Sequence, residues 1–197
     1  VQGLARVSGD ERFAWDSYRR FLQMYGEVVL GIDSRLFEWR LAKHREEAGV
    51  REDSELSAAH LKEIVREYRA VIDDHGDGEF PDDPRGQLWG AIQAVFESWR
   101  TPRAIAYRKA YGIPHDLGTA VNVQAMVYGN RGLNSGTGVA FTRNPATGEK
   151  QLFGEFLVNA QGEDVVAGTR DPLSIDEMAD HLPEAYEQLV ETAERLE

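Results

Sequence analysis

The first half of the chain repeats apolar residues every three or four positions, which is the spacing of amphipathic helices. The spacing predicts helices from residue 11 to about 26–31, and over residues 35–48, 58–72 and 84–111, the last with a break at Pro102. The positions expected to face a core are Phe13, Ser17, Phe21, Met24 and Val28 in the first helix, Phe37, Leu41, His44 and Ala48 in the second, Leu61, Ile64, Val65, Tyr68, Val71 and Ile72 in the third, and Leu88, Ile92, Val95, Phe96 and Trp99 in the fourth.

Local signals at the helix ends support these elements. Ser34, Ser57 and Asp83 are good N-cap residues, and Pro84 stands at a first helical position, where its missing N–H costs nothing. The polar passage DDHGDGEFPDDP at residues 73–84 is typical of a loop. We therefore expect two domains, a helical subdomain at residues 1–82 and a second domain at residues 83–197.

The spacing changes to strand-like alternation after residue 118. In residues 119–128 three valines and Ala125 fall on one side, while Asn122, Gln124 and Met126 fall on the other. Further strands are predicted at residues 138–142 and 152–158, and a capping box at residues 174–177 begins a C-terminal helical segment. The predicted fold class is α+β: a helical subdomain followed by an antiparallel β-meander with flanking helices.

The composition of the chain excludes several classes of site and partner. The 197 residues carry a net charge of -12 and no cysteine, which excludes a disulfide framework and a thiolate metal site and argues against a nucleic-acid partner. No stretch approaches the roughly 18 apolar residues of a membrane span, and no signal peptide opens the chain. We expect a cytoplasmic protein that binds neither nucleic acid nor membrane. Because it begins at Val1 rather than methionine, we also expect a piece of a larger protein.

Three features could carry chemistry, and each has a structural alternative. Residues 135–138 (SGTG) could bring backbone amides to a phosphate, although glycines beside a strand are more often bulges or turns. Glu163 and Asp164 are adjacent carboxylates, so on a strand only one of them would face a ligand or metal. Arg20 could contact an anion, or could form an exposed pair with Asp16 one helical turn earlier.

Six stretches of the sequence resemble the nucleotide-binding domain of the pyruvate, phosphate dikinase family. They are RFAWDSYRRFLQMYG (12–26), DPRGQLWGAIQAVFESW (83–99), PRAIAYR (102–108), GTAVNVQAMVYGN (118–130), SGTGVAFTRNPATGE (135–149) and GEFLVNAQGEDVVAG (154–168). They cover almost the whole chain in the family's order. Phosphoenolpyruvate synthase and rifampicin phosphotransferase share a looser version of two of them, and the NAQGED run at residues 159–164 resembles the dikinase rather than those relatives.

The resemblance implies part of an ATP-grasp fold, in which adenine lies between two α+β lobes and the triphosphate lies under a glycine-rich loop with Mg²⁺. No catalytic residue is expected in the chain itself. The ATP-binding residues implied by position are Gln124, Met126 and Val127 beside adenine, Thr137 and Gly138 at the phosphates, Arg20 as a cationic phosphate contact, and Asp164 near the polyphosphate as a candidate metal ligand.

The family also has parts that this sequence lacks. A lysine and an arginine-containing phosphate loop are expected before Val1, and metal carboxylates with a glutamine and an arginine are expected after Glu197. None of the five histidines matches the family's phosphohistidine motif, which belongs to a separate domain. That domain and the remaining nucleotide-binding lobe are therefore the expected partners, within a homo-oligomeric parent.

The parent would interconvert ATP, pyruvate and phosphate with AMP, phosphoenolpyruvate and pyrophosphate. The chain alone is expected to be inactive. The alternatives are a non-catalytic docking scaffold and the equivalent region of a phosphoenolpyruvate synthase-like phosphotransferase.

Overall fold

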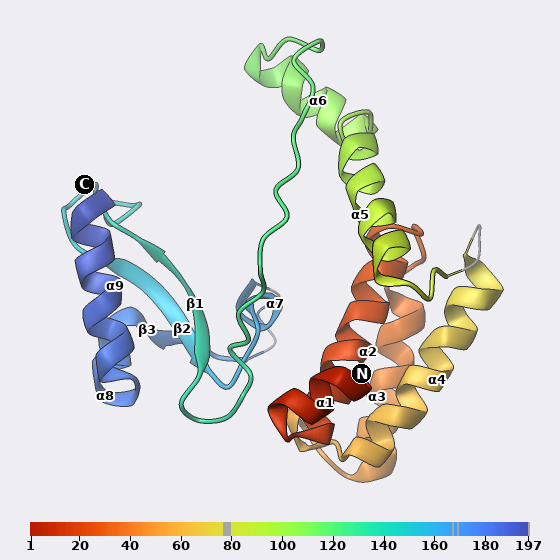
Figure 1. The fold of residues 1–197 in the computed structure, drawn as a ribbon. Helices are drawn as coiled ribbons and strands as arrows, with labels where there is room; N and C mark the ends of the chain where they lie inside the picture. The colour runs from red at the N-terminus through yellow and green to blue at the C-terminus, as the bar shows by residue number, and fades with distance from the viewer. Residues whose placement is uncertain (77–79, 167, 169, 197) are drawn as a thin grey trace. The chain divides into compact units, whose positions relative to one another are not determined.

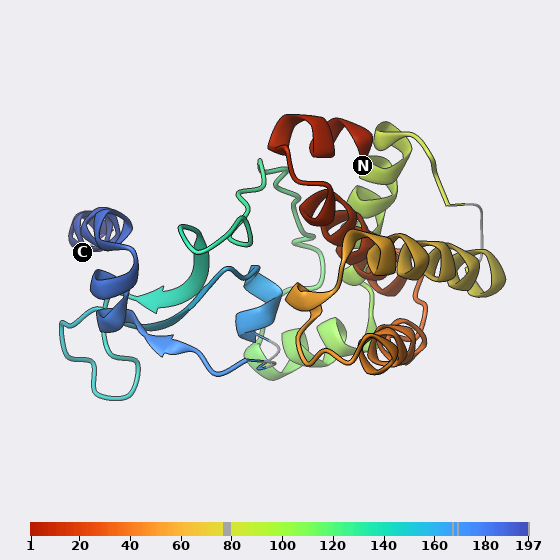
Figure 2. The ribbon, with the colours of Figure 1, turned by 90° about the horizontal axis from the view of Figure 1, so that it is seen from below.

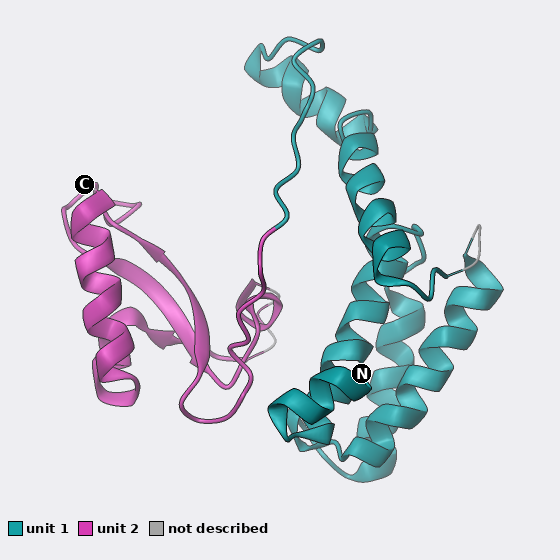
Figure 3. Cartoon of the chain, viewed as in Figure 1, with its two compact units in different colours: residues 1–123 teal, residues 124–197 magenta. Residues whose placement is uncertain are grey.

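The chain forms two compact units, residues 1–123 and 124–197 (Figures 1 and 3). The structure is a computed structural model that describes all residues except 77–79, 167, 169 and 197. The division differs from the boundary that we expected between residues 82 and 83. The helix that follows Pro84 belongs to the first unit, because Gly90 lies so close to Tyr25 that a Cβ atom on Gly90 would be 2.2 Å from the tyrosine hydroxyl.

All regular elements in the described part of the first unit are helices. They are α1 (Gln2–Ser8), α2 (Glu11–Val28), α3 (Arg35–Ala48), the short 3-10 helix η1 (Asp53–Glu55), α4 (Ala58–His75), α5 (Pro84–Ser98) and α6 (Pro102–Tyr111). Helices α2, α3 and α4 lie side by side and enclose the core (Figures 1 and 2). Phe37 of α3 and Tyr68 of α4 meet there edge to face, with ring centroids 4.9 Å apart.

The predicted apolar stripes are confirmed for α4, whose six positions are all buried, and in part for α2. Met24 and Val28 of α2 are 48% and 65% exposed, contrary to the expectation. The buried face of α2 instead includes the charged pair Asp16 and Arg19, which a pattern of apolar residues does not detect. His44 is buried and its Nε2 lies 3.2 Å from Glu67, so it is a packed, partnered histidine as its place on the stripe predicts.

Side-chain caps define several helix starts. The Ser57 hydroxyl accepts from the amide of His60 at 3.3 Å, and Asp83 accepts from the amides of Arg85 and Gly86 at 3.0 and 2.9 Å, as predicted. The predicted N-cap of α3 is wrong by one residue. Asp33 Oδ1 accepts from the backbone amide of Arg35 at 3.0 Å, whereas the Ser34 side chain makes no cap hydrogen bond.

Helix α5 has two unlike sides. Its small residues Gly86 and Gly90 are half-buried, and Gly90 faces Tyr25 of α2. Its large apolar residues Leu88, Trp89, Val95 and Phe96 are 37–65% exposed, so the core positions predicted for Leu88, Val95 and Phe96 are wrong. No residue of α5 is buried.

A cluster of three residues joins the end of α5 to α6. The Arg108 guanidinium lies 3.9 Å from the Trp99 ring centroid, donates from Nη1 to the Trp99 carbonyl at 2.8 Å and from Nε to His115 Nδ1 at 3.0 Å. The Trp99 indole N–H donates to the His115 carbonyl at 3.2 Å. Arg108 is therefore buried.

The second unit is a three-stranded antiparallel sheet with helices. Its elements are β1 (Gly136–Phe141), β2 (Phe153–Val158), α7 (Gly162–Val166), β3 (Leu173–Ser174), η2 (Ile175–Glu177), α8 (Met178–His181) and α9 (Pro183–Leu196). The strand order is β1-β2-β3, with Thr137 opposite Leu157 and Glu155 opposite Ser174. Asn144 stabilises the turn between β1 and β2, because its Oδ1 accepts from the amides of Ala146 and Thr147 at 2.9 and 3.3 Å.

The predicted strand at residues 119–128 is wrong. That segment has no regular secondary structure, and residues 122–127 are exposed. The α+β class nevertheless holds, because the meander is completed by β3 instead. Within the described residues, no helix is both long enough and apolar enough to cross a membrane.

Candidate functional site

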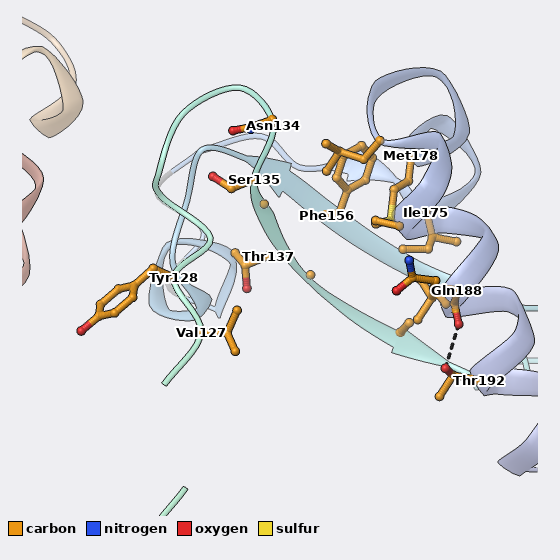
Figure 4. A pocket seen from close by; sticks show the side chains of 16 residues that line it. Val127, Tyr128, Asn134, Ser135, Thr137, Phe156, Ile175, Met178, Gln188 and Thr192 are labelled. Atoms are coloured by element: carbon orange, nitrogen blue, oxygen red, sulfur yellow. Dashed lines mark hydrogen bonds between the residues drawn. The ribbon is translucent and has the colours of Figure 1, made fainter. Parts of the chain in front are cut away.

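A cavity of about 700 Å³ opens between β1 and the helices of the second unit (Figure 4). Val127 and Thr137 lie on its strand side, and Ile175, Met178 and Gln188 lie on its helical side (Figure 4). Its residues are Val127, Tyr128, Asn134–Gly138, Ala140, Phe156, Ile175, Met178, Leu182, Ala185, Gln188, Leu189 and Thr192. Most are apolar, with hydroxyls and amides at a few places, which is the usual make-up of a small-molecule site.

The glycine-rich turn at residues 129–136 leads directly into β1 and borders this cavity. A Cβ atom at Gly129 would lie 2.4 Å from the carbonyl oxygens of both Ala160 and Gly136, so the backbones approach too closely for a side chain. The Ser135 hydroxyl ties the turn to itself, donating to the carbonyls of Gly129 and Gly132 and accepting from the amide of Arg131 at 2.8 Å.

The segment after β2 holds this turn from the other side. The amide of Asn159 donates to the Ser135 carbonyl at 2.8 Å, and the amide of Ala160 donates to the Gly129 carbonyl at 3.0 Å. Asn159 Oδ1 accepts from the amide of Gly132 at 3.0 Å. The turn is thus fixed by both backbone and side-chain contacts.

Three of the predicted ATP-binding residues, Val127, Thr137 and Gly138, line the cavity. The other two predicted adenine neighbours, Gln124 and Met126, lie in the irregular segment before the turn, are exposed and do not line the cavity.

Asp164 lies on α7, a short helix, and not on a strand as the argument from adjacent side chains assumed. Its Oδ2 accepts from the backbone amide of Gln161 at 2.8 Å, and its own amide donates to the Gln161 carbonyl at 2.9 Å. One carboxylate oxygen of Asp164 therefore stabilises the start of α7. Asp164 is half-buried while Glu163 is exposed.

Arg20 lies on α2 in the first unit, where its Nε is 3.4 Å from Asp16 Oδ2. The pair exists as predicted, but it is not exposed: the Arg20 side chain is 12% exposed and the Asp16 side chain 4%. Asp16 also accepts from Arg19, whose Nε and Nη2 lie 2.9 and 2.8 Å from Oδ1. Burial by itself would raise the pKa of Asp16, but the charges of Arg19 and Arg20 outweigh burial and lower the pKa below its ordinary value.

Residues 33–194 match the family described as "Pyruvate phosphate dikinase, AMP/ATP-binding domain". The chain belongs to this family. The family that the six sequence stretches resemble is therefore confirmed.

Three pyruvate, phosphate dikinases illustrate the similarity. The chain is 52% identical over 198 residues to the protein of Clostridium symbiosum, and this alignment covers 100% of the chain and 23% of the relative. It is 59% identical over 179 residues to the protein of Rhizobium meliloti (strain 1021), covering 91% and 20%. It is 58% identical over 197 residues to the chloroplastic protein of Mesembryanthemum crystallinum, covering 100% and 21%. The chain thus spans about a fifth of the length of these curated relatives.

The described residues form no ready-made metal centre. Across residues 1–196, wherever the structure describes them, no three carboxylate or imidazole side chains gather as metal ligands. Mg²⁺ usually takes one or two protein carboxylates and completes its shell with substrate phosphates and water. Asp164 is a candidate for such a single carboxylate ligand.

Sequence reasoning missed two parts of the site. The helical wall formed by Gln188, Leu189 and Thr192 of α9 arises from tertiary packing, which sequence spacing does not reveal. Asn159 was also missed, although asparagine is enriched among residues with positive φ, and that enrichment is the signal that could have singled it out.

Proposed function

We propose that this chain is the part of a pyruvate, phosphate dikinase that receives MgATP. The observation that carries the proposal is the cavity beside the glycine-rich turn, found in a chain of the AMP/ATP-binding domain family. An apolar cavity with few polar groups suits a flat heterocycle. Backbone amides near Thr137 and Gly138 would meet the phosphates, and β1 would form one wall of an ATP-grasp site.

The chain's own residues would act by binding and orientation. Arg20 would neutralise phosphate charge, and Asp164 would orient the phosphates or hold the magnesium ion that accompanies them. Gln124 and Met126 would meet the adenine edge once the segment at residues 119–128 is ordered. Positioning and charge neutralisation are sufficient roles for a phosphoryl-transfer site without a nucleophile of its own.

The full-length protein would carry the rest of the chemistry. We propose that a histidine on a separate domain attacks the β-phosphorus of ATP and AMP leaves, and that inorganic phosphate accepts the γ-phosphoryl group and leaves as pyrophosphate. The remaining phosphohistidine would then transfer its phosphoryl group to pyruvate to give phosphoenolpyruvate. The parent would be a homo-oligomer. We propose a cytoplasmic location for it, while plant relatives such as that of Mesembryanthemum crystallinum are named chloroplastic.

Calorimetric titration of MgATP into this chain and into the full-length protein tests the proposal. We expect tight binding by the full-length protein and very weak binding by the chain, since each missing charge-assisted contact costs about 1.5–3 kcal/mol, or roughly tenfold or more in affinity. Failure of the full-length protein to bind would leave the docking-scaffold alternative. Micromolar binding by the chain alone would contradict its expected weakness.

The two half-reactions separate the roles of individual residues. In rapid-quench experiments on the full-length protein, Arg20→Ala should slow phosphoryl transfer from ATP and leave pyruvate phosphorylation from a preformed phosphohistidine unchanged. Asp164→Ala should do the same with an altered magnesium dependence. Arg35→Ala is the matched control, because the Arg35 side chain is 84% exposed and pairs with Asp33 on the surface. If Arg20→Ala transfers the phosphoryl group from ATP at the wild-type rate, Arg20 does not belong to the site.

A further inference from the structure

Asn159 has an unusual backbone conformation for its residue type. Its φ is +51°, and within the described residues every other positive φ belongs to glycine. Such a left-handed conformation costs a non-glycine residue free energy and persists only where neighbouring contacts hold it. Asparagine tolerates it better than most residues because its short polar side chain can bond locally. The contacts of Asn159 therefore reveal what the conformation accomplishes.

The conformation lets one residue hold the turn at two points. With φ at +51°, the Asn159 amide donates to the Ser135 carbonyl at 2.8 Å while Oδ1 accepts from the Gly132 amide at 3.0 Å. Gly132 has φ of +113°, a value that glycine adopts without steric cost. A glycine at position 159 would adopt the same backbone but could not accept from Gly132.

Arg170 stabilises the backbone at Asn159 through two hydrogen bonds. Its Nη1 donates to the Asn159 carbonyl at 3.2 Å and its Nη2 to the Val158 carbonyl at 3.3 Å. These carbonyls lie at the end of β2, just where the chain turns into the left-handed residue. The guanidinium binds both carbonyls and so restrains the peptide between Val158 and Asn159.

The supported turn leads into the residues that border the cavity. Ser135 and Gly136 line the cavity, and Gly136 begins β1 and is opposite Val158 in the sheet. A shift of the turn would therefore move the backbone amides that precede Thr137. We propose that Asn159 and Arg170 are positioning residues that set the geometry of the turn at residues 129–136 and thereby the affinity for the nucleotide. This inference rests on the MgATP function proposed above.

The role of Asn159 can be tested with a graded series in the full-length protein. Asn159→Asp keeps the acceptor and tolerates the left-handed backbone, Asn159→Gly keeps only the backbone, and Asn159→Ala keeps neither. We expect MgATP affinity within about threefold of wild type for Asn159→Asp, and roughly tenfold weaker for Asn159→Gly, since one hydrogen bond is lost. Asn159→Ala should be weaker still.

The structural readout is amide exchange at Gly132, followed by NMR in this chain. Exchange should be faster in Asn159→Gly and close to wild type in Asn159→Asp. Arg170→Ala should speed the same exchange and weaken MgATP binding. The matched control is Asn144→Ala, which removes another asparagine that caps a turn, between β1 and β2 and outside the cavity lining. It should leave MgATP affinity unchanged.

The outcomes distinguish the two proposals. If the wild-type protein does not bind MgATP, the proposed function fails and the positioning role fails with it. If wild type binds and Asn159→Gly binds equally well while its Gly132 amide exchanges faster, only the positioning role is overturned. The same holds if Asn159→Asp is as weak as Asn159→Ala, because the retained acceptor would then have rescued nothing.

Discussion

Asp16 balances the charge inside the helical unit. It is 3% exposed, contacts Arg19 and Arg20, and has a lowered pKa because these two charges outweigh its burial. Arg19 is equally buried; burial alone would lower its pKa, but the Asp16 carboxylate raises it. Loss of either partner would leave a charge in a nonpolar environment, which is much more costly than loss of a surface pair.

We expect Asp16→Asn to lower the free energy of unfolding by about 3 kcal/mol at neutral pH. The folded pKa is lowered, so this stabilisation is complete above the unfolded value of about 3.9 and is lost as pH falls through the folded value. Urea denaturation near pH 7 measures the loss of stability in Asp16→Asn, and urea denaturation below about pH 4 measures how far the difference from wild type has disappeared. The control is Asp33→Asn: the Asp33 side chain is 44% exposed, and asparagine keeps the oxygen that accepts from the Arg35 amide, so this substitution should cost much less than Asp16→Asn. Equal effects of the two substitutions would contradict a buried role for Asp16.

His115 provides a second test at the residue scale. Its Nδ1 accepts from the Arg108 guanidinium at 3.0 Å. Arg108 is buried, so a variant without this acceptor would leave its guanidinium with one hydrogen bond fewer. Tyr107 and Arg103 line the adjoining hollow with Arg108.

Amide protection over residues 112–117 should therefore fall in His115→Ala, which removes the acceptor. Hydrogen exchange corrected for intrinsic rates measures the change. His115→Gln keeps an acceptor and should retain most of the protection. If His115→Ala is as well protected as wild type, the Arg108 contact does not hold this segment.

At the scale of elements, the fit of α5 on α2 depends on a missing side chain. Tyr25 is 5% exposed and packs against Phe21 and Phe80 with ring centroids 5.6 and 5.3 Å away. Its ring cannot move far, and its hydroxyl occupies the place of a Cβ atom on Gly90. A residue that ordinarily weakens a helix is thus required here for close packing.

Gly90→Ala should destabilise the chain by about 1–3 kcal/mol through overpacking, despite the better helix propensity of alanine. Combining it with Tyr25→Phe should recover most of the loss, because the obstructing hydroxyl is gone. Thermal or urea unfolding of the single and double variants measures the coupling. In α1, where no atom lies within 4 Å of the place of a Cβ on Gly3, Gly3→Ala should be neutral or stabilising. Additive effects of Gly90→Ala and Tyr25→Phe would contradict the contact.

The sequence predicts an element well when the contacts that define it lie within a few residues of one another, and poorly when they join distant parts of the chain. The caps at Ser57 and Asp83 depend on residues within three positions, and both were found. The alternation in residues 119–128 was misleading, because a strand also needs a neighbouring ladder, and no described strand pairs with that segment. Thr137 and Gly138, which stand in a glycine-rich context, line the cavity, whereas the contacts of Asn159 span up to 27 residues and leave no periodic trace.

At the scale of the whole molecule, the connection between the two units is an exposed segment without regular secondary structure. Residues 119–127 form neither helix nor strand, and most are exposed. Protease access requires such unpaired, solvated backbone. The connection also contains several apolar residues that thermolysin accepts.

Brief thermolysin treatment should therefore cut first within residues 119–127 and give two fragments that resist further digestion. Mass spectrometry of the fragments identifies the cut. The sequence pattern had instead suggested the passage at residues 73–84 as the first site. Earlier cleavage there would favour the division at residues 82/83 over that at residues 123/124.

The outward side of α5 has a consequence for how the chain behaves in a cell. Leu88, Trp89, Val95 and Phe96 form an aromatic and aliphatic strip on the surface of a well-formed helix. Molecular chaperones bind such strips, so the chain expressed alone should be retained by them more strongly than a globular domain of the same size. Polar replacements at Trp89 and Phe96 should release it without loss of helical content, because neither side chain is buried.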